Sequence, residues 1–420
     1  LRGTNERRGC PAPARRTRRN VGPGGERAVT VRAQAAAFLR PLGDGSFLLL
    51  LVAGLAVSMS YGVTLPVLPE LVLRVQGGGA DVAARHTGWL TGAYTVALFA
   101  FSPVWGAVSD FLDRRWVIAV GLAGSAIALS LLGMADSLAG VYAARIAAGL
   151  VAAAVMPAVL AYVAGTTAPE RRQRRFAWVA SATALGFLLG PVAGSAASAL
   201  GDRVSELQLV ALACLVAAVL AGRLPRAQGA SGTAASAPDI ATSSLSLGPI
   251  RQAPLLTAAV VFGITVAEVG LTLQGGPVAP YFALCSTLMV AMQLAGYPVL
   301  ERWMGEHRLV WISLAVMAVG VVLLSWRAPW SPAVAFLLAA SALGVLVPAL
   351  AVRISSAAGP RQGRAMGRQA AAGNLGQAGG AALTGVLFPA VPAAPFLLAG
   401  ALLAAGAVIA WAKPDGSNHP

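Results

Sequence analysis

Residues 106–115 read Gly106-Ala-Val-Ser-Asp110-Phe-Leu-Asp-Arg114-Arg115, and they lie between two long apolar stretches. A short segment that carries a carboxylate and two guanidiniums has few uses in the core of a soluble protein. Between hydrophobic runs of about 20 residues, it is typical of a connector that joins two membrane-spanning helices. The stretch therefore predicts a membrane protein with a charged loop at one membrane surface.

The composition agrees with this interpretation. Hydrophobic residues make up 57% of the 420 residues, charged residues only 11%, and the mean hydropathy is +0.72. Soluble domains carry roughly a quarter charged residues, so this chain could not cover a water-facing surface. The net charge of +15 does not indicate nucleic-acid binding, because the arginines cluster in short connectors between apolar runs.

Residues for metal or nucleophilic chemistry are scarce. Cys10, Cys214 and Cys285 form no close pair, which disfavours both a disulfide framework and a zinc site. The three histidines lie at span ends or in the tail, and no Gly-x-x-x-x-Gly-Lys-[Ser/Thr] phosphate-binding stretch occurs. We therefore expect no metal, no cofactor, no ATP-driven pump and no enzyme.

Windows of about 20 apolar residues indicate twelve membrane helices, and hence an all-α membrane protein. They are expected near residues 46–66, 87–108, 116–135, 139–163, 175–199, 206–222, 253–273, 280–300, 309–326, 331–352, 367–388 and 394–412.

The distribution of basic residues predicts an orientation. With both termini and the even-to-odd connectors in the cytoplasm, 26 of the 31 basic residues lie inside, 4 lie outside and 1 lies within a span. Cytoplasmic loops of membrane proteins carry an excess of Lys and Arg. Both termini are therefore predicted to be cytoplasmic. The four outside residues are Arg74, Arg85, Arg203 and Arg327, and Arg145 is the one within a span.

The two halves of the chain look related. Gly186-x-x-x-Gly190 recurs 190 residues later as Gly376-x-x-x-Gly380. Two short proline-containing segments in other spans also recur, 191 and 195 residues later. Such an offset indicates a duplicated six-helix unit. The predicted divisions are a basic disordered cytoplasmic tail (1–45), an N-terminal six-helix bundle (46–222), a cytoplasmic linker (223–252), a C-terminal six-helix bundle (253–412) and a short cytoplasmic tail (413–420). A transit peptide is the alternative for the first 45 residues.

The stretch at Gly106, Asp110, Arg114 and Arg115 resembles the loop signature of the major facilitator superfamily, Gly-x-x-x-Asp-Arg-x-Gly-Arg-Arg between helices two and three. Phe111 replaces the usual Arg, and Asp113 replaces the usual Gly. The resemblance, which covers residues 46–412, implies two six-helix bundles and a conformational switch in which Asp110 caps the N-terminal end of span eleven near Gly367. The alternative is a solvated loop charge that only sets topology.

Span five contains Gly186, Gly190, Pro191 and Gly194 in a pattern similar to the Gly-x-x-x-Gly-Pro-x-x-Gly-Gly motif of 12-span drug:proton antiporters. The resemblance implies a bent, glycine-lined helix that packs against the other half and limits leak. Small residues every fourth position also let a neighbouring backbone approach closely, so plain helix packing is the alternative.

Two charged residues inside spans are candidates for proton coupling and substrate contact. Arg145-x-x-x-Gly149 resembles the family's motif for a proton-coupling arginine, the alternative being that Arg145 snorkels to the outer headgroups. Glu268 is the one acid that falls inside a predicted span away from its ends, about 22 Å from the cytoplasmic end of span seven. Its alternative is a residue of the outer vestibule. The family usually places its essential acids in the first half, and span one has none here.

Together these features predict a secondary active transporter that exports drugs or amphipathic metabolites in exchange for protons, by alternating access, from the bacterial inner membrane. Its expected partners are a small-molecule substrate, protons and membrane lipid, and it is expected to act as a monomer without nucleic acid. The alternatives are an uncoupled metabolite transporter of the same fold and a non-transporting membrane sensor. Polar residues expected to face the cavity are Ser58, Tyr61, Tyr94, Thr183, Gln293, Asn374 and Gln377. Tryptophans expected at the membrane interfaces are Trp116, Trp303, Trp311, Trp326, Trp330 and Trp411.

Overall fold

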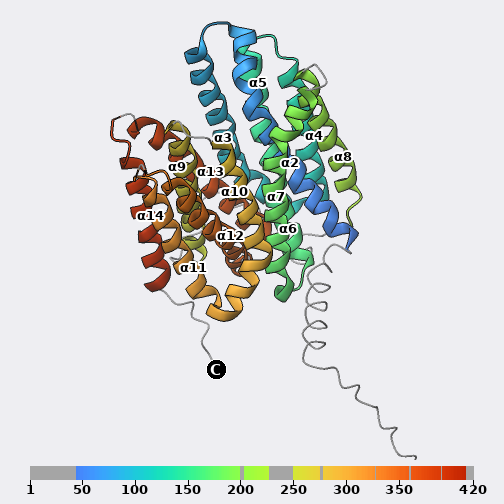
Figure 1. Ribbon diagram of the computed structural model, residues 1–420. Coiled ribbons are helices and arrows are strands. Elements are labelled where there is room, and N and C mark those ends of the chain that lie inside the picture. The colour runs from blue at the N-terminus through green and yellow to red at the C-terminus, as the bar shows by residue number, and fades with distance from the viewer. Residues whose placement is uncertain are drawn as a thin grey trace, which may run out of the picture. The chain divides into compact units, whose positions relative to one another are not determined.

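The computed structural model describes residues 44–198, 203–226, 249–274, 278–326, 328–358, 361–388 and 390–412, which fold as helices joined by short connectors (Figure 1). In lipid, a helix satisfies every backbone hydrogen bond internally, which suits these long apolar runs. The helices of the first half are α2 (Gly45–Gln76), α3 (Ala80–Phe111), α4 (Arg114–Gly133), α5 (Leu138–Ala152), α6 (Val155–Thr166), α7 (Pro169–Ser198) and α8 (Arg203–Gly222). Those of the second half are α9 (Pro249–Leu273), α10 (Val278–Ala291), the π-helix η2 (Met292–Gly296), α11 (Tyr297–Leu323), α12 (Ser331–Ala357), α13 (Gln362–Leu387) and α14 (Ala394–Ala412).

The described helices make up the twelve spans of two six-helix bundles. Eight segments are long and apolar enough to cross a membrane, and one of these, Leu284–Leu323, runs for 40 residues. That segment breaks at Gly305, whose φ of 75° and ψ of 154° are not helical, so it supplies the eighth and ninth spans. The short or more polar helices α7, α8 and α13 complete the set, and α5 and α6 form one interrupted span.

Some boundaries differ from the sequence-based prediction. Helix α9 begins at Pro249, so its first turn lies in the segment predicted to be linker. The eighth span continues to the break at Gly305 rather than ending near residue 300, because the backbone stays helical, through the π-helix η2, until this glycine. Most of the predicted linker and both predicted tails lie outside the described residues.

The glycines of α7 and α13 have the same packing role in the two halves. A Cβ atom on Gly190 would lie 2.6 Å from a backbone nitrogen of α2, and one on Gly380 would lie 2.8 Å from a backbone oxygen of α9. Gly186 and Gly376 meet the backbones of the same two partners. Span five therefore contacts span one as span eleven contacts span seven, which is the relation expected of a duplicated unit.

Tryptophan side chains are exposed where the sequence predicts membrane interfaces. Trp303 is 84% exposed and Trp326 is 66% exposed. Of the six tryptophans predicted there, Trp311 alone is half-buried. Exposed indoles at the ends of membrane helices suit the headgroup region, where one edge of the ring is apolar and the other is wet.

Candidate functional site

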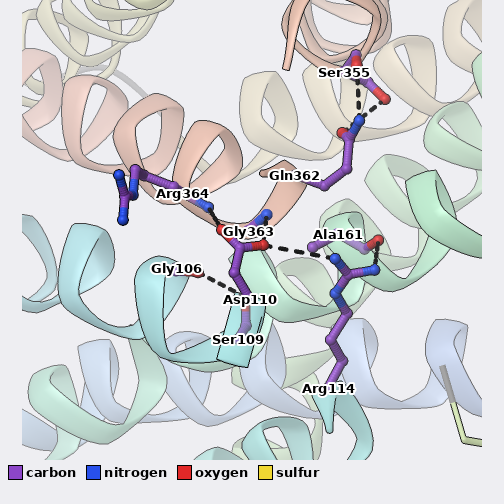
Figure 2. A network of polar contacts seen from close by, with 9 residues as sticks. All are labelled: Gly106, Ser109, Asp110, Arg114, Ala161, Ser355, Gln362, Gly363 and Arg364. Carbon is purple, nitrogen blue, oxygen red and sulfur yellow. Dashed lines mark hydrogen bonds and ion pairs between the residues drawn. The ribbon is translucent and has the colours of Figure 1, made fainter. Parts of the chain in front are cut away.

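Asp110 joins the two halves of the protein at the ends of their helices. Its Oδ1 accepts a hydrogen bond from the backbone N–H of Gly363 at 2.8 Å, and its Oδ2 accepts one from the N–H of Arg364 at 2.9 Å. Figure 2 shows the carboxylate pointing at the first turn of α13. These N–H groups have no partner within their own helix, and a negative charge there also interacts favourably with the helix dipole. The structure thus contains the predicted cap on span eleven, one turn before Gly367. We call Asp110 with Gly363 and Arg364 the clasp.

Glycines let α3 and α13 cross at backbone contact beside the clasp. A Cβ atom on Gly106 would lie 2.5 Å from the backbone oxygen of Gly363 and 2.8 Å from the Cα of Gly367. One on Gly367 would lie 2.6 Å from the backbone oxygen of Ser102. The glycine of the loop signature therefore brings Asp110 within hydrogen-bonding distance of a helix in the other half.

The two arginines of the signature hold the loop within its own half. Arg114 is buried, its Nη1 donates to the backbone oxygen of Ala161 at 2.9 Å, and its Nη2 lies 3.6 Å from Oδ1 of Asp110. The Nε of Arg115 lies 2.9 Å from Oδ2 of Asp113. Arg114 therefore orients the clasp carboxylate, whereas Arg115 pairs elsewhere.

The two departures from the family signature have local structural roles. Asp113 caps α4, because its side chain accepts a hydrogen bond from the backbone N–H of Arg115. An aspartate at this position satisfies an N–H that a glycine would leave to solvent. Phe111 is the last residue of α3 and is 60% exposed, so its replacement of an arginine removes a surface charge without touching the clasp.

A second polar cluster surrounds Arg145 inside the N-terminal half. The Arg145 side chain is only 1% exposed, and its Nη1 donates to Oγ1 of Thr64 at 3.0 Å. Its guanidinium carbon lies 4.5 Å from the ring centroid of Tyr94 and 5.9 Å from that of Tyr61, both within cation–π range. The alternative that Arg145 snorkels to the headgroups is therefore wrong, since the side chain turns inward among aromatic rings.

Glu268 lies in α9, in the opposite half, and is half-buried. Its carboxyl interacts electrostatically with the hydroxyl of Tyr61 and with Cys285. Tyr61 in turn interacts with Arg145. The two charged residues singled out from the sequence are thus connected through one tyrosine on α2, which sequence reasoning named only as a cavity residue.

A hydrogen bond deep in the protein also connects the halves. Ser181 of α7 donates to Oε1 of Gln293 in the π-helix η2 at 2.8 Å, and each residue is 1% exposed. Gln293 was expected to face the cavity, but this bond holds it in the interface. Ser181 and Thr64 were not predicted, because isolated hydroxyl residues in apolar helices give no pattern in the sequence.

Other predicted residues lie on α7 and α13. Gly186 and Gly190 face α2 of their own half, although α7 as a whole also contacts α10 and α12 of the other half. Pro191 and Gly194 lie within α7, but the surroundings of residues 191–198 are outside the described part of the chain, so a bend at Pro191 remains a prediction. Asn374 donates to Ser102 at 3.4 Å across the α3–α13 contact.

Comparison with known proteins agrees with this geometry. Residues 50–274 match the family model described as Major Facilitator Superfamily. The chain belongs to the major facilitator superfamily. This is a family of membrane transporters rather than enzymes, so the protein is a multi-pass transport protein.

Relatives within the superfamily include resistance proteins. The chain is 27% identical over 381 residues to Multidrug resistance protein 2 of Bacillus subtilis, covering 86% of this chain and 93% of the relative. It is 36% identical over 165 residues to the class D tetracycline resistance protein of Salmonella ordonez, covering 39% of this chain and 40% of the relative. The crystal structure of the human organic anion transporter MFSD10 is similar in fold, with a TM-score of 0.73 and 19% identity over 87% of this chain and 99% of that one.

Proposed function

We propose that this protein is a proton-coupled exporter of drugs or amphipathic metabolites that works by alternating access in a bacterial inner membrane. The observation that carries the proposal is the connection from Arg145 through Tyr61 to Glu268, which joins a buried cation in one half to a carboxyl in the other. The similarity to multidrug and tetracycline resistance proteins supports the direction and the substrate class.

The geometry supports a coupled cycle for a physical reason. A carboxyl inside a membrane protein can carry one proton, and its charge state alters its interaction with every polar group nearby. When Glu268 is ionised, its negative charge acts on Tyr61, whose ring lies near the Arg145 guanidinium. When it is protonated, that electrostatic interaction falls, and the coupling between the two halves is weaker. Proton binding would therefore bias the equilibrium between the two states of the transporter.

The test is a transport assay in proteoliposomes with an imposed pH gradient. Ethidium is the first amphipathic probe, and a panel of other amphipathic compounds is then tested in the same way. Wild type should drive ethidium uphill, and Glu268→Gln should lose uphill transport while keeping downhill exchange. Glu70→Gln, an exposed carboxyl near the end of α2, is the matched control and should behave as wild type.

Each contrary result has a meaning. Downhill movement that ignores the pH gradient in wild type would identify an uncoupled transporter. Absence of movement for the whole panel would favour a sensor. Uphill transport that survives Glu268→Gln would exclude this carboxyl as the coupling group.

The proposed orientation places both termini in the cytoplasm, as the 26-to-4 distribution of basic residues favours. Single cysteines introduced near residues 172, 235 and 415 should react from the cytoplasmic side, and those near residues 80 and 203 from outside. Labelling of position 235 from outside intact cells would contradict this topology.

A further inference from the structure

A second hydrogen bond between the halves is related to the clasp by the internal repeat. The side-chain amide of Gln173, near the start of α7, donates to Oε2 of Glu301, near the end of span eight. The offset of 190 residues that pairs Gly186 with Gly376 also pairs residue 173 with Gly363, to which the carboxylate of the clasp is bonded. Each half therefore supplies a carboxylate that reaches the equivalent residue of the other half.

The spans that carry these residues are exchanged between the two contacts. Asp110 lies at the end of span two and reaches span eleven, whereas Glu301 lies near the end of span eight and reaches span five. A duplicated six-helix unit relates span two to span eight and span eleven to span five. The packing agrees, because α13 contacts α3, and α7 contacts α10 and η2 of span eight. Spans five and eleven are six spans apart along the chain, so both begin at the same membrane surface.

The local geometry explains why the second contact uses a side-chain amide. Gly363 is the second residue of α13, so its N–H has no partner within the helix and can donate to Asp110. Gln173 lies in the second turn of α7, which begins at Pro169, so its N–H is bonded within the helix. The amide side chain supplies the donor instead, and a glutamate at residue 301 has one methylene more of reach than an aspartate.

We propose that Gln173 and Glu301 form a second clasp, which holds the two halves together on the side of the protein that Asp110 closes. Both side chains are half-buried, so water competes only in part for the bond, and the charge of the carboxylate strengthens it. A single bond between two side chains contributes less to the closed state than the two backbone bonds of Asp110. The second clasp needs the alternating movement of the proposed function, but neither proton coupling nor a particular substrate.

The test measures opening at the contact between α3 and α13, which contains neither residue. In a background without the native cysteines, Ser102→Cys places a thiol against α13, where the serine is 1% exposed, and a maleimide labels this thiol in purified protein in nanodiscs. At pH 8, Gln173→Glu should raise the labelling rate by about tenfold or more, because it brings two carboxylates together. Glu301→Gln should raise the rate about threefold, because a neutral hydrogen bond is weaker than a charge-assisted one. Gln173→Glu combined with Glu301→Gln should return the rate to within about twofold of wild type, because donor and acceptor are interchanged.

Arg171→Gln is the matched control, since this exposed arginine lies on the same helix and its replacement changes the charge by the same one unit. Its labelling rate should stay within about twofold of wild type, because salt screens an exposed charge. Equal labelling in Arg171→Gln and Gln173→Glu would show an effect of general charge and would overturn the second clasp. A combined variant that labels as fast as Gln173→Glu alone would do the same.

Two outcomes separate the second clasp from ordinary packing and from the transport cycle. If Gln173→Glu lowers the melting temperature without faster labelling, the bond serves packing alone and the second clasp is refuted. If Gln173→Glu does not insert into the membrane, the milder Glu301→Gln decides, and an unchanged labelling rate in that variant would refute the second clasp. Labelling needs no substrate and no pH gradient, so a failure of proton-coupled export in proteoliposomes would leave this result unchanged.

Discussion

Replacement of Asp110 by asparagine should weaken the closed state of the transporter by a predictable amount. The aspartate accepts two backbone hydrogen bonds, at 2.8 and 2.9 Å, from the first turn of α13. Asparagine keeps one acceptor oxygen, so one N–H loses its partner and the other loses its charge-assisted bond. Hydrogen bonds to a charged group contribute about 1.5–3 kcal/mol, and a charge at a helix N-terminus about 0.3–1 kcal/mol. A net loss of about 2 kcal/mol corresponds to a shift of roughly 30-fold toward the open state.

A thiol buried in the same contact reports this shift. Ser102 is 1% exposed against α13, and its replacement by cysteine changes the side chain very little. In a background without the three native cysteines, Ser102→Cys should react slowly with a membrane-impermeant maleimide in inside-out vesicles. Added Asp110→Asn should raise the labelling rate by about 30-fold, because labelling follows the open fraction. Transport should slow although the protein still inserts into the membrane.

Asp113→Asn is the control, since that carboxylate pairs with Arg115 in the same loop and does not contact α13 in the described structure. Its labelling rate should stay within about twofold of wild type, since this ion pair lies within one loop and does not join the two halves. If Asp110→Asn and Asp113→Asn label at the same rate, the clasp does not hold the two halves together. Asp110 would then be a topology charge only.

Three further changes test the interior of the protein. Arg145→Met should leave the melting temperature in detergent unchanged or higher, because two buried nitrogens of Arg145 have no hydrogen-bond partner among the described residues. Uphill transport should fall at least tenfold, and a fall in both quantities would show a structural role. Gly190→Ala should lower the free energy of unfolding by about 1–3 kcal/mol, since the new Cβ meets the α2 backbone. Gly92 has open space around it, so Gly92→Ala should be neutral in the same thermal assay. The stability losses caused by Ser181→Ala and Gln293→Leu should differ from additivity by about 0.5–3 kcal/mol in a double-mutant cycle. Strict additivity of the two losses would show that the hydrogen bond contributes nothing.

The architecture followed from the sequence because the signals for it are long and repeated. Twelve apolar runs, the asymmetry of the arginines and the glycine pairs near an offset of 190 residues each depend on many residues. A bilayer also removes most alternatives, since unsatisfied backbone groups are costly in hydrocarbon. The differences seen in the described residues lie at helix ends, as at Pro249 and Gly305, whereas the orientation stays a prediction.

The partners of single side chains were harder to predict. Asp110 could be assigned to span eleven only through a family signature, since no local pattern relates residue 110 to residue 363. The snorkelling alternative for Arg145 could not be rejected, because depth along a helix does not reveal the direction in which a side chain points. Gln173 and Glu301 look like ordinary loop residues, and only the folded structure shows that the two side chains share a hydrogen bond.

The π-helix η2 determines how α10 is rotated relative to α11 about the axis of the eighth span. A π-turn arises when one extra residue is accommodated in an α-helix, and one residue corresponds to about 100° of rotation. The orientation of α10 relative to α11, and hence the direction of Gln293 toward α7, depends on that single residue. Deletion of one residue from Met292–Gly296 would straighten the span and turn its outer part by about a quarter of a circle. Sequence alignments of the two halves should therefore carry a one-residue gap at this point, and relatives without the insertion should join the halves by other contacts here.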